Sequence, residues 1–306
     1  MITVTSYRNP DLDGVACSIA YTELLLKLGK EARATYFGQT GLEVDFVKDY
    51  SGGFPIEAKN DGYSENDRFV LVDTADSDAI DPSISPDQVI EIYDHRKLIF
   101  LENFKNAKSK IEQVGSCATL IAEQFKKHNL EPSKIASLYL YGAIVSNTIN
   151  FKNTTTTKRD KAAAKWLKTF LNLPNNFTEK MFLSKSKVNS SNFKGVIEQD
   201  FAVKTVKGKK VGIAQMEIAK LDIFINANKI KLEKFFEYLK KQRSLDYFLF
   251  TGIDILEGFN RFITVDQKSE KLFSKALGVK DKMRDIKVGY ITMRKQIWPK
   301  LDAVIV

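Results

Sequence analysis

Short apolar runs alternate with longer amphipathic segments along the first part of the chain. Four runs of apolar and β-branched residues predict strands, at residues 2–7, 32–37, 68–73 and 88–95. Five segments with apolar residues at helical spacing predict helices, at residues 19–28, 42–47, 117–125, 135–149 and 161–171. Strands that are apolar throughout favour a parallel sheet covered on both faces. We therefore predict an α/β fold whose N-terminal part is a parallel sheet flanked by helices.

The second part of the chain begins after a polar stretch. Residues 184–192 lack apolar periodicity, which is typical of a linker. Beyond it, residues 201–206 and 211–216 flank a Lys-Gly-Lys-Lys turn and predict a hairpin, residues 230–241 predict a helix, and residues 247–255 and 261–265 predict strands. A chain of 306 residues is long for one domain. We expect domains at residues 1–186 and 195–306, joined by a linker at 187–194.

The turn after the first predicted strand carries two carboxylates, Asp11 and Asp13, with Pro10 before them and Gly14 after them. Asp is a good cap for a turn or a helix, and capping explains either residue alone. Two like charges at this spacing are costly unless a cation or proton lies between them. From this turn alone, capping and metal ligation are equally good interpretations.

Two further predicted strands end in acidic residues. Asp73 is the last residue of one of them, and Asp94 and His95 are the last residues of the next. Capping explains Asp73, and orientation of the imidazole explains Asp94. Because the carboxyl ends of parallel strands meet at one edge of a sheet, we expect these side chains to share a crevice with Asp11 and Asp13. The shared position favours a metal site over incidental capping.

Composition restricts the chemistry of such a site. The chain has two histidines, His95 and His128, so the ligands must be mostly carboxylates, which favours Mg²⁺ or Mn²⁺. Cys17 and Cys117 are far apart and lie in apolar helical segments, which indicates buried thiols. The net charge is +9, and we interpret it as a lysine-rich solvated surface, because zinc-finger spacing and RNA-binding aromatic signatures are absent from the sequence.

The sequence has no secretory signal pattern and no apolar run long enough to span a bilayer. We therefore expect a cytoplasmic protein that does not enter the membrane and has no dedicated nucleic-acid module.

Two other places are candidates for anion binding. Residues 114–119 enter a helix through small residues, among them Ser116, so that backbone N–H groups there favour an anion, although Gly-Ser is also an ordinary helix start. Arg294 and Lys295 lie side by side in an otherwise apolar segment. They indicate either a strand edge protected by charge or a cationic clamp for phosphate, and the sequence favours neither.

The order of these motifs resembles that of a known superfamily. The motifs are Asn9-Pro10-Asp11-Leu12-Asp13, Val72-Asp73, Asp94-His95-Arg96, Val114-Gly115-Ser116, Phe151-Lys152, residues 208–215, Asp254-Ile255-Leu256 and Arg294-Lys295-Gln296. In combination they resemble the DHH phosphoesterase superfamily, in the branch with a DHHA2 C-terminal domain that includes family II manganese-dependent inorganic pyrophosphatases, exopolyphosphatases and prune proteins. The resemblance implies a smaller α/β C-terminal domain with a mixed sheet. It also implies a water that bridges two metal ions.

The resemblance also assigns roles to residues. It implies that Asp11, Asp13, Asp73 and His95 are metal ligands, and that Asp13 and Asp73, the bridging candidates, act in catalysis with Arg96. It implies substrate contacts, between the domains, from Arg96, Ser116, Asn147, Lys152, Arg294 and Lys295. The cofactor would be Mn²⁺ or Mg²⁺, as one or two ions, and the substrate a small phosphate compound. A homodimer is possible.

The sequence departs from the family pattern at three positions near the predicted metal ions. Tyr7 replaces a ligating His, Arg96 replaces the second His of the DHH motif, and Asn147 replaces a ligating Asp. A neutral amide and a phenol are weaker ligands than the groups they replace, so one metal position is predicted to be weakened. The last motif is also shortened before Arg294, which leaves its register open.

Three functions follow from these features. We favour a metal-dependent hydrolase of pyrophosphate or short-chain polyphosphate. The first alternative is a phosphodiesterase on nucleotides or short oligonucleotides, for which Tyr7, Tyr93 and Trp298 would stack on bases. The second is a non-catalytic phosphate- or nucleotide-binding homologue.

Overall fold

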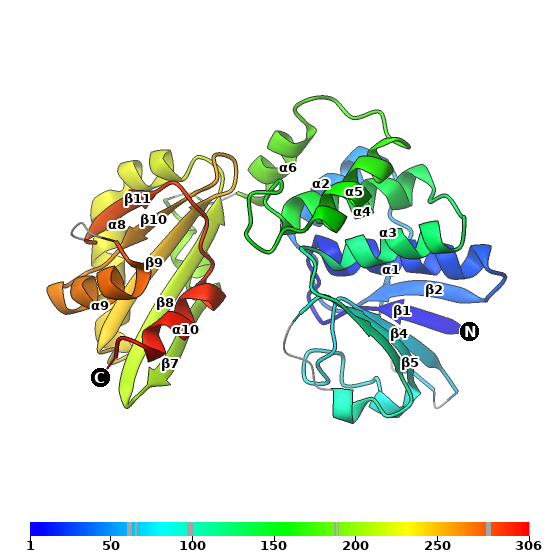
Figure 1. Cartoon of the computed structure of the whole chain (residues 1–306), viewed down its shortest axis with the longest axis horizontal. Helices are drawn as coiled ribbons and strands as arrows, with labels where there is room; N and C mark the ends of the chain where they lie inside the picture. Colours follow the sequence, from blue (N-terminus) through cyan, green and yellow to red (C-terminus); the bar gives the residue numbers. More distant parts are fainter. Residues whose placement is uncertain are drawn as a thin grey trace. The chain divides into compact units, whose positions relative to one another are not determined.

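A computed structural model describes residues 1–59, 63–64, 66–96, 101–186, 188, 190–279 and 283–305. The chain divides into two compact units, Met1–Lys185 (unit 1) and Ser186–Val306 (unit 2). Figure 1 labels helices and strands of both units.

Unit 1 is built on a six-stranded sheet in which all strand pairs are parallel. Its strands are β1 (Ile2–Thr5), β2 (Ala32–Tyr36), β3 (Glu57–Ala58), β4 (Arg68–Val72), β5 (Val89–Asp94) and β6 (Lys108–Ile111). Their order is β3-β2-β1-β4-β5-β6. From β1 the chain adds strands toward one edge as far as β3 and then adds β4, β5 and β6 toward the other edge, so the order of strand addition reverses between β1 and β4. Ligands of open α/β sheets bind at the carboxyl ends of the strands beside such a reversal.

The helices of unit 1 lie on one face of this sheet in Figure 1. They are α1 (Leu12–Lys27), α2 (Leu42–Ser51), α3 (Cys117–Lys127), α4 (Lys134–Asn147), α5 (Lys158–Lys168) and α6 (Phe177–Lys185). The other face is covered by residues 75–88, which include the short 3₁₀ turn η1 (Pro86–Gln88), and by residues 101–107, which include η2 (Leu101–Asn103). From these two segments Ile80, Ile84 and Phe104 pack against Phe69 and Ile92 of the sheet. The sheet is therefore buried on both faces, as its apolar strands predict.

Unit 2 contains a mixed five-stranded sheet with helices on both faces. Its elements are α7 (Phe193–Gln199), β7 (Phe201–Val206), β8 (Lys209–Ile218), α8 (Leu221–Gln242), β9 (Tyr247–Asp254), β10 (Phe259–Ile263), α9 (Gln267–Leu277), β11 (Asp285–Val288) and α10 (Arg294–Asp302). The order is β11-β10-β9-β8-β7, in which only β8 and β9 pair in parallel. α8 packs on one face through Phe236, and α9 and α10 pack on the other through Phe273 and Ile297. The predicted fold class is confirmed in both units.

Several boundaries differ from those predicted. α5 begins at Lys158, not at residue 161, because Thr157 caps the helix and Asp160 completes a capping box inside it. α8 begins at Leu221, well before residue 230. The strand interpretation of the segment around Arg294 is wrong, since Arg294 is the first residue of α10. α7 begins at Phe193, inside the expected linker, and linker residues 187 and 189 lie outside the described residues.

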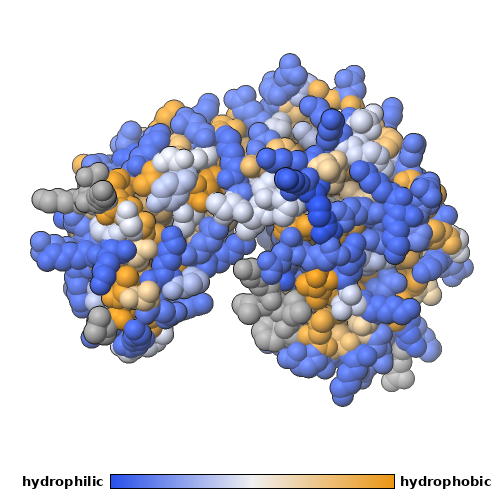
Figure 2. Space-filling model, in the orientation of Figure 1, coloured by the Kyte–Doolittle hydropathy of each residue, from blue (hydrophilic) through white to orange (hydrophobic). Residues whose placement is uncertain are grey.

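The surface and the two thiols agree with the composition. Hydrophilic residues cover most of the face seen in Figure 2, with apolar residues scattered among them. Cys17 and Cys117 are buried and not disulfide-bonded. Among the described residues, no helix is long and apolar enough to cross a membrane.

Candidate metal centre

Three side chains from three strand ends converge at the carboxyl edge of the unit 1 sheet. Asp13 lies in the first turn of α1, which follows β1, while Asp73 follows β4 and His95 follows β5. One ligand atom from each lies within 4.8 Å of the other two. His95 Nε2 is 3.3 Å from Asp73 Oδ1 and 3.8 Å from Asp13 Oδ2. Two carboxylates and an imidazole are a donor set that suits Mn²⁺.

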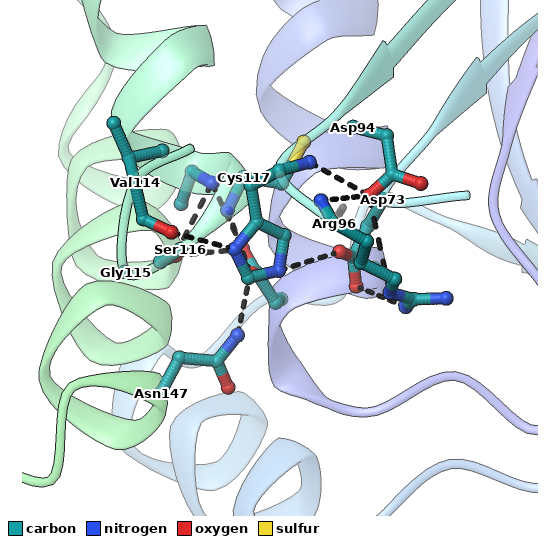
Figure 3. A network of polar contacts seen from close by, with 12 residues as sticks. Asp73, Asp94, Arg96, Val114, Gly115, Ser116, Cys117 and Asn147 are labelled. Atoms are coloured by element: carbon teal, nitrogen blue, oxygen red, sulfur yellow. Dashed lines mark hydrogen bonds and ion pairs between the residues drawn. The ribbon is translucent and has the colours of Figure 1, made fainter. Parts of the chain in front are cut away.

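Asp13 of α1 is fully buried against the N-terminus of α3, where its carboxylate accepts four hydrogen bonds from N–H and O–H groups and a weaker one from Cys17 Sγ at 3.5 Å. Its Oδ1 accepts hydrogen bonds from Ser116 Oγ and Ala118 N, both at 2.9 Å. Its Oδ2 accepts from Cys117 N at 2.8 Å and from Asn147 Nδ2 at 2.6 Å. Figure 3 shows the Val114–Cys117 segment and Asn147 on the same side of this network. The positive end of the α3 dipole and these donors keep the carboxylate in place.

Asp73 is the most strained residue of the centre. Its φ is +57°, in the left-handed region that non-glycine residues rarely adopt, and such strain is often found at functional sites. Its side chain is 1% exposed, and Oδ1 forms no hydrogen bond in the described part of the chain although His95 Nε2 is nearby. Burial and the charge of Asp13 raise the pKa of Asp73 to about 7, against the opposing effect of His95 and Arg96.

The buried Oδ1 of Asp73 is the observation that fits a metal. It forms no hydrogen bond among the described residues, and its close polar contact is His95 Nε2 at 3.3 Å. A buried oxygen without a hydrogen bond is costly, and a cation held between Asp73, Asp13 and His95 would satisfy it. Hard oxygen donors with one imidazole match Mn²⁺ or Mg²⁺ better than a soft, sulfur-binding ion. The residues present therefore fit the predicted cofactor.

His95 is oriented by a backbone carbonyl. Its Nδ1–H donates to Val114 O at 2.9 Å, which turns Nε2 toward the two carboxylates. Burial by itself lowers the pKa of His95, but the contact with Asp73, the charges of Asp73 and Asp13, and the Val114 carbonyl outweigh it and raise the pKa to about 9. The imidazole therefore holds a proton where a metal ion would compete for it.

Asp11 and Asp94 lie beside this group, and their carboxylates accept hydrogen bonds from nearby backbone N–H groups. Asp11 Oδ1 accepts from Asp13 N at 2.8 Å and Gly14 N at 3.2 Å, as the N-cap of α1. Asp94 Oδ1 accepts from His95 N at 2.7 Å and Arg96 N at 3.2 Å. Neither residue belongs to the group of three ligand atoms. The role of Asp11 as a ligand stays a prediction.

The positively charged guanidinium of Arg96 lies near the other carboxylate oxygen of Asp73, Oδ2. Its Nη2 is 3.5 Å from Asp73 Oδ2 and its Nε is 3.9 Å from Asp94 Oδ1. The guanidinium lies over the Tyr7 ring, 5.0 Å from the centroid. The Tyr7 hydroxyl accepts a hydrogen bond from Asp11 N at 3.2 Å, and burial raises its pKa so that it stays neutral. Figure 3 shows Arg96 beside Asp73 and Asp94.

The other predicted contact residues are more scattered. Ser116 is fully buried, and its hydroxyl donates a hydrogen bond to Asp13, so its side chain fixes the position of a predicted metal ligand. Its contact with substrate stays a prediction. Lys152 is exposed and follows Ile149, Asn150 and Phe151, three residues with φ between +49° and +66°. A run of left-handed residues is unusual and marks a strained turn after α4.

Arg294 and Lys295 belong to unit 2 and begin α10. Arg294 forms an ion pair with Asp200 at 2.6 Å, and its backbone N–H donates to Gln215 Oε1 at 2.7 Å. Lys295 is exposed.

Asp160 of α5, which sequence reasoning missed, supports the loop that carries Val114 and Ser116. Asp160 is fully buried and its carboxylate accepts from Gly115 N at 2.9 Å, Thr119 Oγ1 at 2.6 Å and Thr157 N at 2.7 Å. It joins α5 to the loop that carries Val114 and Ser116. The spacing Thr157-x-x-Asp160 is a capping-box pattern and could have placed Asp160 inside the helix.

Comparison with known protein families agrees with this arrangement. The DHH family N-terminal domain matches residues 1–143, and the DHHA2 domain matches residues 179–304. The chain belongs to the DHH family and carries a DHHA2 domain. The resemblance seen in the sequence motifs is thereby confirmed.

Relatives of this DHH–DHHA2 protein span its whole length. The manganese-dependent inorganic pyrophosphatase of Bacillus subtilis is 27% identical over 305 residues, which are 98% of this chain and 97% of that protein. The crystal structure of a candidate family II inorganic pyrophosphatase from Methanococcus jannaschii has a TM-score of 0.72, with 26% identity and 99% coverage of both chains. An exopolyphosphatase-related protein from Bacteroides fragilis shares the fold, with a TM-score of 0.52, 12% identity and coverage of 99% and 91%.

Proposed function

We propose that this protein is a metal-dependent hydrolase of phosphoanhydrides, with inorganic pyrophosphate or short-chain polyphosphate as substrate. The observation that carries the proposal is the buried Asp73 Oδ1, which has no hydrogen bond in the described structure and faces His95 and Asp13. Full-length relatives named manganese-dependent inorganic pyrophosphatases support the same chemistry.

Asp13, Asp73 and His95 would hold the divalent ion, with Asp11 as a further ligand. A bound Mn²⁺ or Mg²⁺ would lower the pKa of a water and polarise a phosphoryl oxygen. The hydrogen bonds to Asp13 keep one of these side chains fixed, and the Val114 carbonyl keeps His95 Nε2 turned toward the two carboxylates with which it would bind the ion.

The cationic residues would supply the phosphate contacts. Arg96 is 41% exposed at its side chain while one edge touches Asp73, so its outer N–H groups are accessible to a phosphate oxygen. Lys152 and Lys295 are exposed, and Arg294 is held in position by Asp200. Such charges stabilise the negative charge that develops on the transferred phosphoryl group.

A phosphodiesterase is the alternative that the experiment must separate. It needs aromatic faces for stacking on bases. Tyr93 is engaged through its hydroxyl by Tyr21, and Trp298 packs against the core of unit 2, so both have structural roles. The Tyr7 ring faces the Arg96 guanidinium.

The test measures product release with Mn²⁺ from three substrates: pyrophosphate, tripolyphosphate and a short RNA. We expect orthophosphate from at least one of the first two, at a rate that Asp73→Asn lowers at least about 10³-fold. Asp76→Asn, on the same loop, is the matched control and should retain activity. Mononucleotide release from RNA without orthophosphate from either anhydride would select the phosphodiesterase instead. Binding of pyrophosphate without turnover would select the non-catalytic homologue.

Two further expectations complete the proposal. The protein would act in the cytoplasm, and it would exist as a monomer or a homodimer. Fractionation of the cells that make it and light scattering of the purified chain test them.

A further inference from the structure

The two oxygens of the Asp73 carboxylate lie in different surroundings. Oδ1 faces His95 Nε2 at 3.3 Å and the Asp13 carboxylate, and it has no hydrogen bond among the residues described. Oδ2 faces Arg96 Nη2 at 3.5 Å. One side of this carboxylate thus faces an imidazole and a carboxylate that can both bind a metal ion, and the other side faces the fixed positive charge of Arg96.

Arg96 is held at this position from several directions. Its Nε is 3.9 Å from Asp94 Oδ1, and the same oxygen accepts its backbone N–H at 3.2 Å. The guanidinium plane lies over the Tyr7 ring. An aromatic face, a buried carboxylate and a backbone anchor together restrict a side chain that is otherwise flexible. The positive charge therefore stays beside Asp73 Oδ2.

A second divalent ion would need this same place. Phosphatase centres with two ions hold them about 3.5–4 Å apart, and a shared carboxylate binds one ion through each oxygen. The ion on the far side of Asp73 would lie where the guanidinium is. Of the nearby groups, the Tyr7 hydroxyl already accepts a hydrogen bond, and among the described residues Asp11 uses only Oδ1 to cap α1, so the Arg96 guanidinium is the main obstacle to an ion there.

We propose that the centre takes a single divalent ion, held by Asp13, Asp73 and His95, and that the Arg96 guanidinium is a built-in second cation on the opposite oxygen of Asp73. The proposal rests on the metal centre of the proposed function and specifies how many ions it holds. Arg96 has a fixed charge at all relevant pH values, so this part of the centre does not depend on metal concentration.

The fixed charge also predicts how the protein responds to metal. An enzyme that must load two ions responds to manganese with two binding events, whereas this centre should respond with one. The Arg96 charge should also keep a second ion away by repulsion and by occupying its place. Removing that charge should open the second position.

The experiment titrates the full-length protein with Mn²⁺ and follows bound ions by electron paramagnetic resonance, without substrate and without any activity measurement. The variants are Arg96→Gln, which removes the charge, and Arg96→Lys, which keeps it. Arg243→Gln, an exposed change in unit 2, is the matched control. Circular dichroism checks that each variant is folded.

We expect the wild type, Arg96→Lys and Arg243→Gln to bind one ion per chain with the spectrum of an isolated Mn²⁺. We expect Arg96→Gln to bind a second ion that is exchange-coupled to the first. Two coupled ions in the wild type, or a single ion in a folded Arg96→Gln variant, would overturn the proposal. No bound ion in the wild type would instead contradict the proposed function, so the two failures are distinguishable.

Discussion

Asn147 Nδ2 donates a 2.6 Å hydrogen bond to Asp13 Oδ2. The amide therefore supplies a partner for a fully buried carboxylate at the place where a second carboxylate would repel it. Together with Ser116, Cys117 and Ala118, it satisfies Asp13 through the protein alone. Part of the centre is thus stable before any ion arrives, while Asp73 Oδ1 is not satisfied in this way.

The first prediction concerns this amide. Asn147→Asp should lower the melting temperature of chelator-treated protein by several degrees, because two carboxylates would meet in a buried site. The same variant should bind Mn²⁺ at least about tenfold more tightly, because another charged oxygen ligand is added. Calorimetry measures both effects. Asn129→Asp, at an exposed position, is the control and should change neither. Equal Mn²⁺ affinity in Asn147→Asp and the wild type would contradict the interpretation.

The second prediction concerns the protonation of His95. In the metal-free protein its ring should titrate with a pKa near 9, because the contact with Asp73 and the charges of Asp73 and Asp13 outweigh burial. Proton NMR can follow it directly, since the chain has only two histidines and His128→Gln removes the other signal. A pKa at or below 6.5 in chelator would show that the carboxylates do not act on this ring.

The raised pKa of His95 makes the stability of the metal-free protein decrease as the pH rises. The folded protein holds the His95 proton more tightly than the unfolded chain does, so the contribution is fully present below pH 6.5 and is lost as the pH rises through about 9. Saturating Mn²⁺ should displace this proton and weaken the pH dependence of stability. Thermal melting between pH 6 and 10, with chelator and with Mn²⁺, measures it. A metal-free protein whose stability rises across this range through His95 would contradict the assignment.

The third prediction concerns Asp160. Asp160→Ala leaves the buried Gly115 N–H and Thr119 hydroxyl without their acceptor, and it should lower the free energy of unfolding of unit 1 by about 3 kcal/mol. Urea unfolding followed by Trp166 fluorescence measures this, in a Trp298→Phe background that removes the only other tryptophan. Asp78→Ala, an exposed change, should stay within about 0.5 kcal/mol. A similar small effect of Asp160→Ala would show that the loop does not depend on α5.

The fourth prediction separates two neighbouring cations of unit 2. Lys295→Gln should raise KM for pyrophosphate without changing stability, because Lys295 is exposed. Arg294→Gln should raise KM and also lower the free energy of unfolding of unit 2, by about 1 kcal/mol or less, because it breaks the ion pair with Asp200. Steady-state kinetics and urea unfolding followed by Trp298 fluorescence measure the two effects. Unchanged KM in both variants would remove these residues from the substrate site.

The sequence predicted the location of the centre because strand ends follow a simple rule. Asp73 and His95 come directly after apolar strands of a parallel sheet, so their shared edge follows from the strand pattern. Asp13 was placed by the same rule, in the first turn of the helix after β1. The positions of side chains that directly follow strands can be predicted without knowing how distant parts of the chain pack.

What the sequence could not predict depends on contacts between distant parts of the chain. The donors to Asp13 come from α3 and α4, and a local pattern does not say that they would surround one carboxylate. The same is true of Arg96 over Tyr7. Arg294 was ambiguous for a different reason, because its apolar segment is too short to distinguish a strand from a helix by periodicity.

The most direct test of the central claim is the location of manganese in crystals of the full-length protein, from anomalous scattering at the manganese absorption edge. We predict a strong peak within coordination distance of one oxygen each from Asp13 and Asp73 and of His95 Nε2. Crystals grown with saturating Mn²⁺ that show no peak at these three residues would contradict the account.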